Sequence, residues 1–424
     1  MNIKKPHCFL TLSLILIMIA AQLIRSPFLL PVTAAGSGST FVDPTVSLGF
    51  QPNVHLGLSV YIGPFASLQS GALSTGIFGA DARNITIGSE SNVQDNVTID
   101  ASAGAVEIGE QAIVAHGATV RGVTLSRGLN FNLIHERVSD ARVGVGGVCP
   151  GGAARCPSFV SFNALVEGAT IQKDAMVSAL ARVGPFVTIP SGFKVLPGKN
   201  VTSSAQVDLS RGKVAPVTEA DREFMNGVIE VNLCFAEKYA ELAADDPTNV
   251  LGINFDPGRC AFNPNRDLPK LGSTHTPTRE TTFRNRIIGD VRLENTLAEL
   301  NAVMGSRISL RADEGEAFEV GTIASMGDGV IFHALEHTHL HLGNGGNYGV
   351  CSIVHGGPTD FNDTTITGDN FSLGAQSVFF RSRIGDNSRV GFKSLVQQSD
   401  LPANTTIGDY TIIISNVEMG VVEW

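Results

Sequence analysis

The segment "ARVGPFVTI" (residues 181–189) contains the repeat that decides the fold. An aliphatic residue is followed by Gly, and four variable residues then lead to the next aliphatic position. This six-residue period predicts a hexapeptide-repeat parallel β-helix, in which three units close one triangular coil. Successive coils hydrogen-bond at about 4.8 Å, so the aliphatic residues point inward. The pattern recurs in "VYIGPFASL" (60–68), "ITIGSESNV" (85–93), "VEIGEQAIV" (106–114), "RIIGDVRLE" (286–294), "SRIGDNSRV" (382–390) and "TTIGDYTII" (405–413).

The repeats fall into two blocks, so the sequence predicts a mainly β protein with two tandem β-helix domains. The first domain is expected at 45–245 and ends in an α-helix, because apolar residues recur at helical spacing between 217 and 246. Residues 246–285 contain frequent Pro and Gly and are interpreted as a linker. The second domain is expected at 286–424.

The composition fits many short strands joined by tight turns. The chain has 424 residues, 46 of them Gly, and a formal net charge of -10. This acidic balance, without a basic patch, argues against a nucleic-acid partner.

The N-terminus predicts a secretory signal peptide at residues 1–35. Lys4 and Lys5 precede an apolar run at 9–21, and small residues follow at 33–35. We therefore expect export to the periplasm, the cell surface or the medium. An uncleaved membrane anchor is the alternative, although the run is shorter than the roughly 20 residues that a span requires.

Export makes disulfides possible. Cys149 and Cys156 flank the loop "CPGGAARC" (149–156) and are predicted to pair. Cys234 and Cys260 could form a second disulfide, and Cys351 is interpreted as a small buried residue.

The stretch "GVIFHALEHTHLHLGNGGNYGVCSIVHGG" (329–357) reads as half of a metal site. His333 and His355 each follow a strand-like run. A catalytic zinc site normally has three protein ligands, so one is missing here. The alternating histidines at 337, 339 and 341 are interpreted as loop residues, with a proton relay or a stray metal site as the alternative.

Several motifs resemble the γ-class carbonic anhydrases and the related carboxysomal scaffold domain. The resemblance covers the chain beyond the N-terminal segment as two tandem copies. It implies left-handed β-helices that pack as a trimer. In such a trimer a metal ion lies between neighbouring subunits, and it is held by two histidines from one subunit and by one histidine from the next. The motifs are "NVQD" (92–95), "VAHGATVRG" (114–122), "IEVNLCFAEKY" (229–239), "RADEG" (311–315), "HALE" (333–336) and "VHGG" (354–357).

Matched residue by residue, each copy has lost positions that the other keeps. The second block has Val350, Ser325 and Gly327 where the family has a ligand His, Asn and Gln. The first block differs from the family at the other positions. The family's Arg and Asp, the His and Glu of "HALE" and the last ligand are replaced there by Gln69, Gly71, Asp100, Ala103 and Arg121, respectively. We therefore predict one composite metal site, within one chain or between two, made by His116, His333 and His355.

The resemblance also implies roles. The metal would be Zn²⁺, with Fe²⁺ or Co²⁺ as alternatives, and the reaction would convert CO2 to bicarbonate in a homo-oligomer with trimer-like packing. Glu314 and Glu336 would relay the proton. Arg311 and Asp313 would form a structural ion pair at the interface. The groups that orient water or CO2 would be Gln94, Asn92 and Asn232.

Two other functions remain open at the level of sequence. A non-catalytic scaffold would also tolerate lost ligands, but it has no reason to keep complementary ones. Many hexapeptide β-helices are acyltransferases, yet these use coenzyme A, which is scarce outside the cytoplasm. We therefore expect no coenzyme A.

Overall fold

The computed structural model describes residues 38–49, 53–71, 83–126, 136–153, 155–245, 250, 284–289, 291–314, 317–335, 338–357 and 364–424. The predicted signal segment and most of the predicted linker lie outside these residues. Within the described ranges, no helix is both long enough and apolar enough to cross a membrane.

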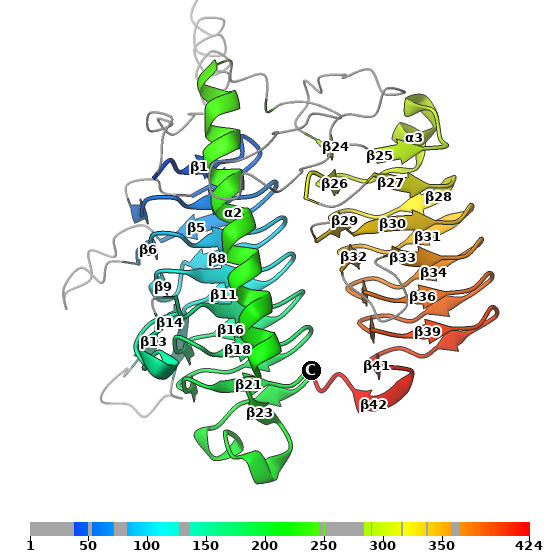
Figure 1. Cartoon of the computed structure of the whole chain (residues 1–424). Helices are drawn as coiled ribbons and strands as arrows, with labels where there is room; N and C mark the ends of the chain where they lie inside the picture. The colour runs from blue at the N-terminus through cyan, green and yellow to red at the C-terminus, as the bar shows by residue number, and fades with distance from the viewer. Residues whose placement is uncertain are drawn as a thin grey trace, which may run out of the picture. The chain divides into compact units, whose positions relative to one another are not determined.

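The first β-helix consists of three parallel sheets whose strands follow one another around each coil (Figure 1). Sheet A contains β1 (Phe41–Val42), β4 (Tyr61–Ile62), β7 (Asn92–Val93), β10 (Ala112–Val114), β15 (Ser158–Val160), β18 (Met176–Val177), β21 (Phe193–Val195) and the antiparallel β23 (Val214–Pro216). Sheet B contains β2 (Ser47–Leu48), β5 (Ser67–Ser70), β8 (Thr98–Ala101), β11 (Thr119–Arg121), β16 (Leu165–Glu167), β19 (Arg182–Val183) and β22 (Asn200–Val201). Sheet C contains β3 (Val54–Leu56), β6 (Ile85–Ile87), β9 (Val106–Ile108), β14 (Ala141–Val143), β17 (Thr170–Ile171) and β20 (Thr188–Ile189).

The second β-helix repeats this arrangement. Sheet E contains β24 (Arg286–Gly289), β26 (Ser309–Ala312), β29 (Ile331–Ala334), β32 (Ile353–Gly356), β35 (Val378–Phe380), β38 (Leu395–Gln397), β41 (Thr411–Ile414) and the antiparallel β42 (Val417–Val421). Sheet F contains β25 (Val291–Leu293), β27 (Phe318–Val320), β30 (His339–Leu342), β33 (Thr364–Thr367), β36 (Arg383–Ile384) and β39 (Asp400–Leu401). Sheet G contains β28 (Ile323–Met326), β31 (Gly346–Tyr348), β34 (Ser372–Leu373), β37 (Arg389–Val390) and β40 (Thr406–Ile407).

These sheets confirm the predicted fold of two left-handed parallel β-helices. The repeat aliphatic residues fill the inside of each one and form two separate apolar cores. Many corners adopt positive φ, for which Asn is well suited because its short side chain tolerates the left-handed region. Examples are Asn96, Asn163 and Asn387, with φ between 50° and 56°.

Three details differ from the expectation or add to it. The first strand begins at Phe41, ahead of the predicted start at 45. A two-stranded antiparallel hairpin, β12 (Val123–Ser126) and β13 (Glu136–Ser139), projects between two coils. Helix α3 (Leu297–Val303) was not predicted, although Thr296 and Glu299 form a capping box that signals its start.

The predicted helix is α2 (Glu219–Asp245), which packs on sheet A. Its buried face includes Val228, Phe235 and Tyr239. Cys234 lies on this helix and is disulfide-bonded, but its predicted partner Cys260 lies outside the described residues. Cys149 and Cys156 are joined by a disulfide with Cα atoms 5.5 Å apart.

Both β-helices belong to one compact unit and share an apolar cluster. Ile113 and Phe159 of sheet A, Ile229 of α2, and Ile331 and Ile353 of sheet E are members of this cluster. Burial of apolar side chains from both partners stabilises the contact. Sheet A of the first β-helix therefore faces sheet E of the second.

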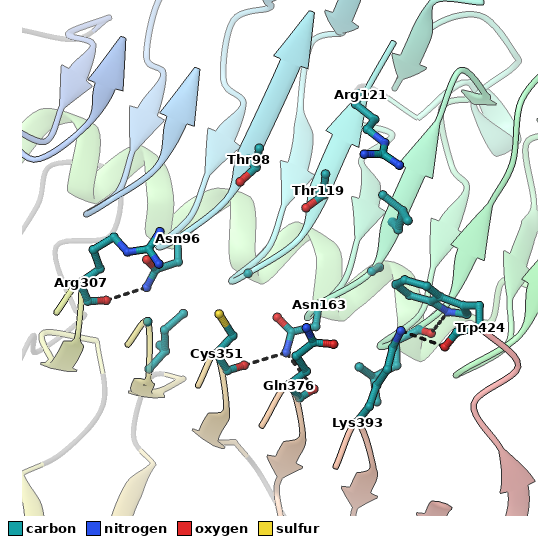
Figure 2. A pocket seen from close by; sticks show the side chains of 16 residues that line it. Asn96, Thr98, Thr119, Arg121, Asn163, Arg307, Cys351, Gln376, Lys393 and Trp424 are labelled. Atoms are coloured by element: carbon teal, nitrogen blue, oxygen red, sulfur yellow. Dashed lines mark hydrogen bonds between the residues drawn. The ribbon is translucent and has the colours of Figure 1, made fainter. Parts of the chain in front are cut away.

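Polar bonds and a C-terminal segment also join the two β-helices. Asn163 Nδ2 donates to the carbonyl oxygen of Cys351 at 3.0 Å across a pocket of about 350 Å³ (Figure 2). At the far end of this pocket, Trp424 Nε1 donates to the carbonyl oxygen of Leu180 at 2.6 Å. Lys393 Nζ lies 3.3 Å from the centre of the Trp424 ring. The C-terminal residues thus fasten the second β-helix to the first.

Candidate metal centre

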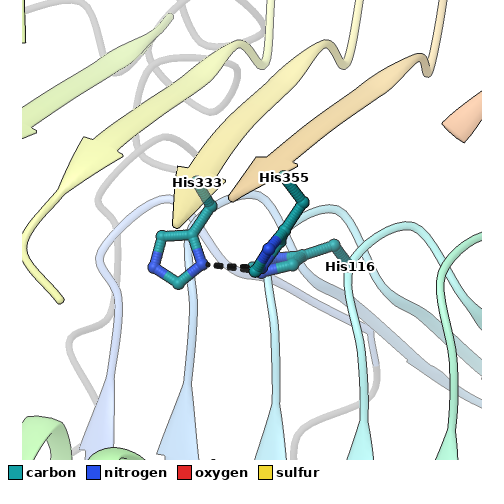
Figure 3. Close-up of side chains that lie close together, drawn as sticks. All are labelled: His116, His333 and His355. Carbon is teal, nitrogen blue, oxygen red and sulfur yellow. Dashed lines mark hydrogen bonds between the residues drawn. The ribbon is translucent and has the colours of Figure 1, made fainter. Parts of the chain in front are cut away.

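Three buried histidines meet where sheet A faces sheet E (Figure 3). His333 and His355 are register partners on the adjacent parallel strands β29 and β32, so their side chains leave the sheet on the same face. His116 comes from the corner after β10. The next residue, Gly117, has φ of +70°, and a Cβ atom there would collide with the Asn163 side chain. The structure therefore brings all three predicted ligands together within one chain.

The inner nitrogens have the spacing of a metal site. Nε2 of His116 lies 3.2 Å from Nδ1 of His333, and that atom lies 3.2 Å from Nε2 of His355. All three atoms are within 4.8 Å of one another. Ligands about 2.0–2.1 Å from a tetrahedral metal are about 3.3–3.4 Å apart, so a small divalent cation fits between these atoms.

The outer nitrogens of two rings face hydrogen-bond acceptors. Nδ1 of His355 lies 2.6 Å from the carbonyl oxygen of Gly356, which can only accept a hydrogen bond, so the proton is on Nδ1 and the lone pair of Nε2 is directed inward, as metal ligation requires. Nδ1 of His116 faces the Asp95 carboxylate at 3.7 Å, which is too long for a hydrogen bond but favours the same tautomer.

His333 is oriented in the opposite sense. Its Nε2 lies 3.5 Å from carboxylate oxygens of Asp313 and Glu314, so the proton is favoured there and the lone pair is on Nδ1. A single Nδ1 atom could not in any case donate to both neighbouring rings. With these tautomers all three inner nitrogens would present lone pairs to one point, which is the arrangement that a bound cation requires.

Burial keeps two of these imidazoles neutral. The apolar surroundings lower the pKa of His116 and of His355 well below the ordinary value, and the neighbouring His333 lowers both further. A neutral imidazole is the ligand form of histidine.

A charged network surrounds the centre. Arg311 Nη1 pairs with Asp95 of the first β-helix, and Arg311 Nε lies 3.0 Å from Asp313. Tyr239 of α2 and Ser309 donate hydroxyl hydrogen bonds to Asp313 and Asp95, respectively. Burial alone would raise the pKa of Asp313, but the Arg311 guanidinium holds it below the ordinary value. The predicted pair of Arg311 and Asp313 is thus part of a larger network that joins both β-helices.

Sequence reasoning missed Asp95 and Tyr239. Asp95 is the last residue of the "NVQD" motif, so the signal was present but was read only for its two amides. Tyr239 had been assigned to the apolar face of α2. Its hydroxyl reaches a carboxylate that is 74 residues away in sequence, which periodicity cannot reveal.

The other predicted site residues differ in how closely they approach the centre. Glu314 is 4 % exposed and faces His333, whereas Glu336 lies outside the described residues. Asn92 is fully buried, and neither of its amide atoms has a hydrogen-bond partner in the described parts of the chain. Gln94 is buried on the same motif.

Asn232 is buried on α2, and its Nδ2 donates to the carbonyl oxygen of Val228, one turn earlier, at 2.8 Å. This bond leaves Oδ1 as the atom that could orient water or CO2, so the role of Asn232 stays a prediction. The histidines at 339 and 341 require a correction, because they lie on strand β30 rather than in a loop.

Sheet B carries the matching positions, and within the described residues these form no cluster of candidate metal ligands. Gln69, Asp100 and Arg121 align across β5, β8 and β11. Arg121 and Arg182 both bind Glu167, the former through Nε at 3.0 Å. Burial would raise the pKa of Glu167, but the two guanidinium groups lower it. These positive side chains occupy the face that would otherwise hold a cation.

No family model matches the chain, but several known proteins are similar to it in sequence. Gamma carbonic anhydrase 2 from Arabidopsis thaliana mitochondria is 24 % identical over 248 residues, which are 54 % of this chain and 77 % of that protein. Carbonic anhydrase from Methanosarcina thermophila is 23 % identical over 197 residues, 42 % of this chain and 72 % of that protein.

Carboxysome assembly proteins are also similar. CcmM from Synechocystis is 30 % identical over 136 residues, which are 30 % of this chain. The match spans only 18 % of that protein, and 23 % of the CcmM from Nostoc. The homologues of this chain are therefore γ-class carbonic anhydrases and CcmM, which confirms the resemblance found in the sequence.

Proposed function

We propose that this protein is a metal-dependent carbonic anhydrase with one composite centre per chain. The observation that carries the proposal is the convergence of three buried imidazole nitrogens from two β-helices. Three protein ligands with a fourth position left open are typical of a catalytic rather than a structural zinc site. Zn²⁺ is the expected cation, and Fe²⁺ and Co²⁺ would suit the same ligands.

When bound, the cation would lower the pKa of water at the open position and so supply the nucleophile for CO2 hydration. The protein residues would do the rest. Phe162 lies 4.9 Å from the His355 ring and 5.9 Å from the His116 ring, between centroids. This aromatic wall would exclude bulk water and accept apolar CO2. The unpaired amide of Asn92, with Gln94, would orient CO2 or water by hydrogen bonds.

The reaction releases one proton for each bicarbonate formed. Asp313 and Glu314 both lie 3.5 Å from Nε2 of His333. Because Asp313 is paired with Arg311, we assign the proton relay to Glu314. A general base must lie within reach of the proton that it accepts, directly or through one water. Glu336 would extend this relay, and its role stays a prediction.

The relatives support the reaction but not activity itself. The two carbonic anhydrases match over most of their own length. CcmM relatives favour a second candidate, a non-catalytic assembly protein, in which the centre would serve only to hold the β-helices together.

We also propose export, on the basis of the charged, apolar and small residues at 1–35. N-terminal sequencing of the protein recovered outside the cytoplasm would test it: a start near residue 36 is expected. A homo-oligomer with trimer-like packing stays a prediction, which light scattering would check.

Metal analysis of the chain without a purification tag tests the central proposal. We expect about one transition metal per chain and CO2 hydration in a stopped-flow assay. His116→Ala and His333→Ala should each lose the metal, whereas His341→Ala, on an exposed strand position, should retain it. Metal retained by His116→Ala would refute the composite centre. Bound metal without hydration, with an intact fold by circular dichroism, would favour the assembly protein.

A further inference from the structure

Arg381 lies next to the candidate centre and has no role in the mechanism above. It follows β35, whose last residue, Phe380, is the register partner of His355. The backbone nitrogen of Arg381 donates to the carbonyl oxygen of His355 at 3.0 Å. Arg381 is therefore fixed one coil beyond the metal-binding strand, on the sheet that faces the first β-helix.

The side chain is held between aromatic rings from both β-helices. The guanidinium carbon lies 4.6 Å from the ring centre of Phe380 and 5.2 Å from that of Phe224 in α2. The aliphatic part covers Gly357, where a Cβ atom would come within 2.9 Å of Arg381 Cγ. Aromatic faces attract a cation but cannot accept its hydrogen bonds, so the donors stay available.

The charge of Arg381 is not balanced by an acid among the described residues. Arg381 is partly buried. The two fully buried arginines are paired: Arg311 with Asp95 and Asp313, and Arg286 with Asp43 at 3.1 Å. Nε of Arg381, in contrast, is buried without a hydrogen-bond partner. Burial lowers the pKa of Arg381 to about 10, so the group remains cationic at neutral pH. A buried unpaired cation is costly unless an anion occupies the site.

We infer that Arg381 binds the oxyanion product, bicarbonate, beside the three-histidine centre. The Phe380 ring contacts both groups: its centre lies 4.6 Å from the Arg381 guanidinium carbon and 5.4 Å from the centre of the His355 ring. Bicarbonate is planar and offers two adjacent oxygens, which a guanidinium group can bind with two parallel hydrogen bonds. Apolar CO2 gains nothing from this charge, so Arg381 distinguishes the anion from the gas. This inference rests on the proposed function.

Ligand titration of the cobalt(II)-loaded protein tests it, with the visible absorption of cobalt as the readout. Bicarbonate serves as the anionic probe and 1,2,4-triazole as the neutral probe. Arg381→Met should raise the Kd for bicarbonate about tenfold or more, the loss expected for a charge-assisted hydrogen bond. The Kd for triazole should change less than twofold. Arg381→Lys keeps the charge but not the planar guanidinium group, so its Kd for bicarbonate should lie between those of the unaltered protein and of Arg381→Met.

Arg389→Met is the matched control, because it removes one positive charge from an exposed position on β37. It should leave both constants unchanged. The inference is overturned if Arg381→Met leaves the bicarbonate Kd unchanged, or if both ligands weaken equally. These results differ from failure of the proposed function, which would appear as no cobalt bound or no CO2 hydration in the unaltered protein.

Discussion

Asp95→Asn separates the contribution of the charged network to folding from its contribution to metal binding. Asp95 is fully buried and has three neighbours in the network: the Arg311 guanidinium, the Ser309 hydroxyl and, at 3.7 Å, the His116 ring. The amide has the same size and still accepts one hydrogen bond, but it no longer carries charge. Removing one partner of a buried ion pair typically costs about 3–5 kcal/mol.

The expected loss in the metal-free protein is smaller, about 2–3 kcal/mol, because Arg311 keeps Asp313. A second effect should appear only with metal. Mutation of a carboxylate that orients a ligand histidine typically weakens metal affinity 10–100-fold. At about 1.4 kcal/mol for each factor of ten, metal-bound protein should lose a further 1.4–2.8 kcal/mol, roughly.

Urea unfolding with saturating Zn²⁺ and with EDTA measures both quantities. Asp400→Asn, at an exposed position on β39, controls for the loss of one carboxylate and should change neither. Equal destabilisation with and without zinc would show that Asp95 does not orient His116, and the tautomer argument for that ring would fail.

Three further predictions concern contacts that lie away from the three histidines. Arg side chains hold the Glu167 pKa low in the folded state, so its stabilisation is present above about pH 4.3 and is lost as the pH falls below that value. Glu167→Gln should therefore flatten the acid limb of stability against pH, measured by urea unfolding. Replacing both Cys149 and Cys156 by Ser should lower the free energy of unfolding by about 2 kcal/mol, and dithiothreitol should then have no further effect at this loop. Trp424→Ala removes the ring contact with Lys393 and a hydrogen bond, and should cost about 1–2 kcal/mol; an unchanged Tm by scanning calorimetry would contradict the fastening role.

The fold was predictable because each coil depends on residues close in sequence. The six-residue period identifies inward positions. His333 and His355 are 22 residues apart, which is not a whole number of repeats, so their common face follows from the register of β29 with β32 and not from the period. Helix α3 could also have been predicted from the capping box of Thr296, whereas the hairpin at 123–139 has no comparable signal.

The centre was predictable only in part. The three candidate ligands, which the structure brings together, were predicted from their motifs and from the complementary losses in the two copies. The network was not, because Asp95 and Arg311 are 216 residues apart and meet only when sheet A packs on sheet E. Arg381 was missed for the same reason: its unbalanced charge is visible only once Phe224 and Phe380 enclose it.

Supplying all three imidazoles from a single polypeptide makes assembly of the centre a first-order process. Dilution should not empty it, because no second molecule has to be captured. In a mixture of intact chains and His116→Ala chains, the activity should fall in simple proportion to the fraction of altered chains, because an altered chain contributes no ligand to the centre of an intact one.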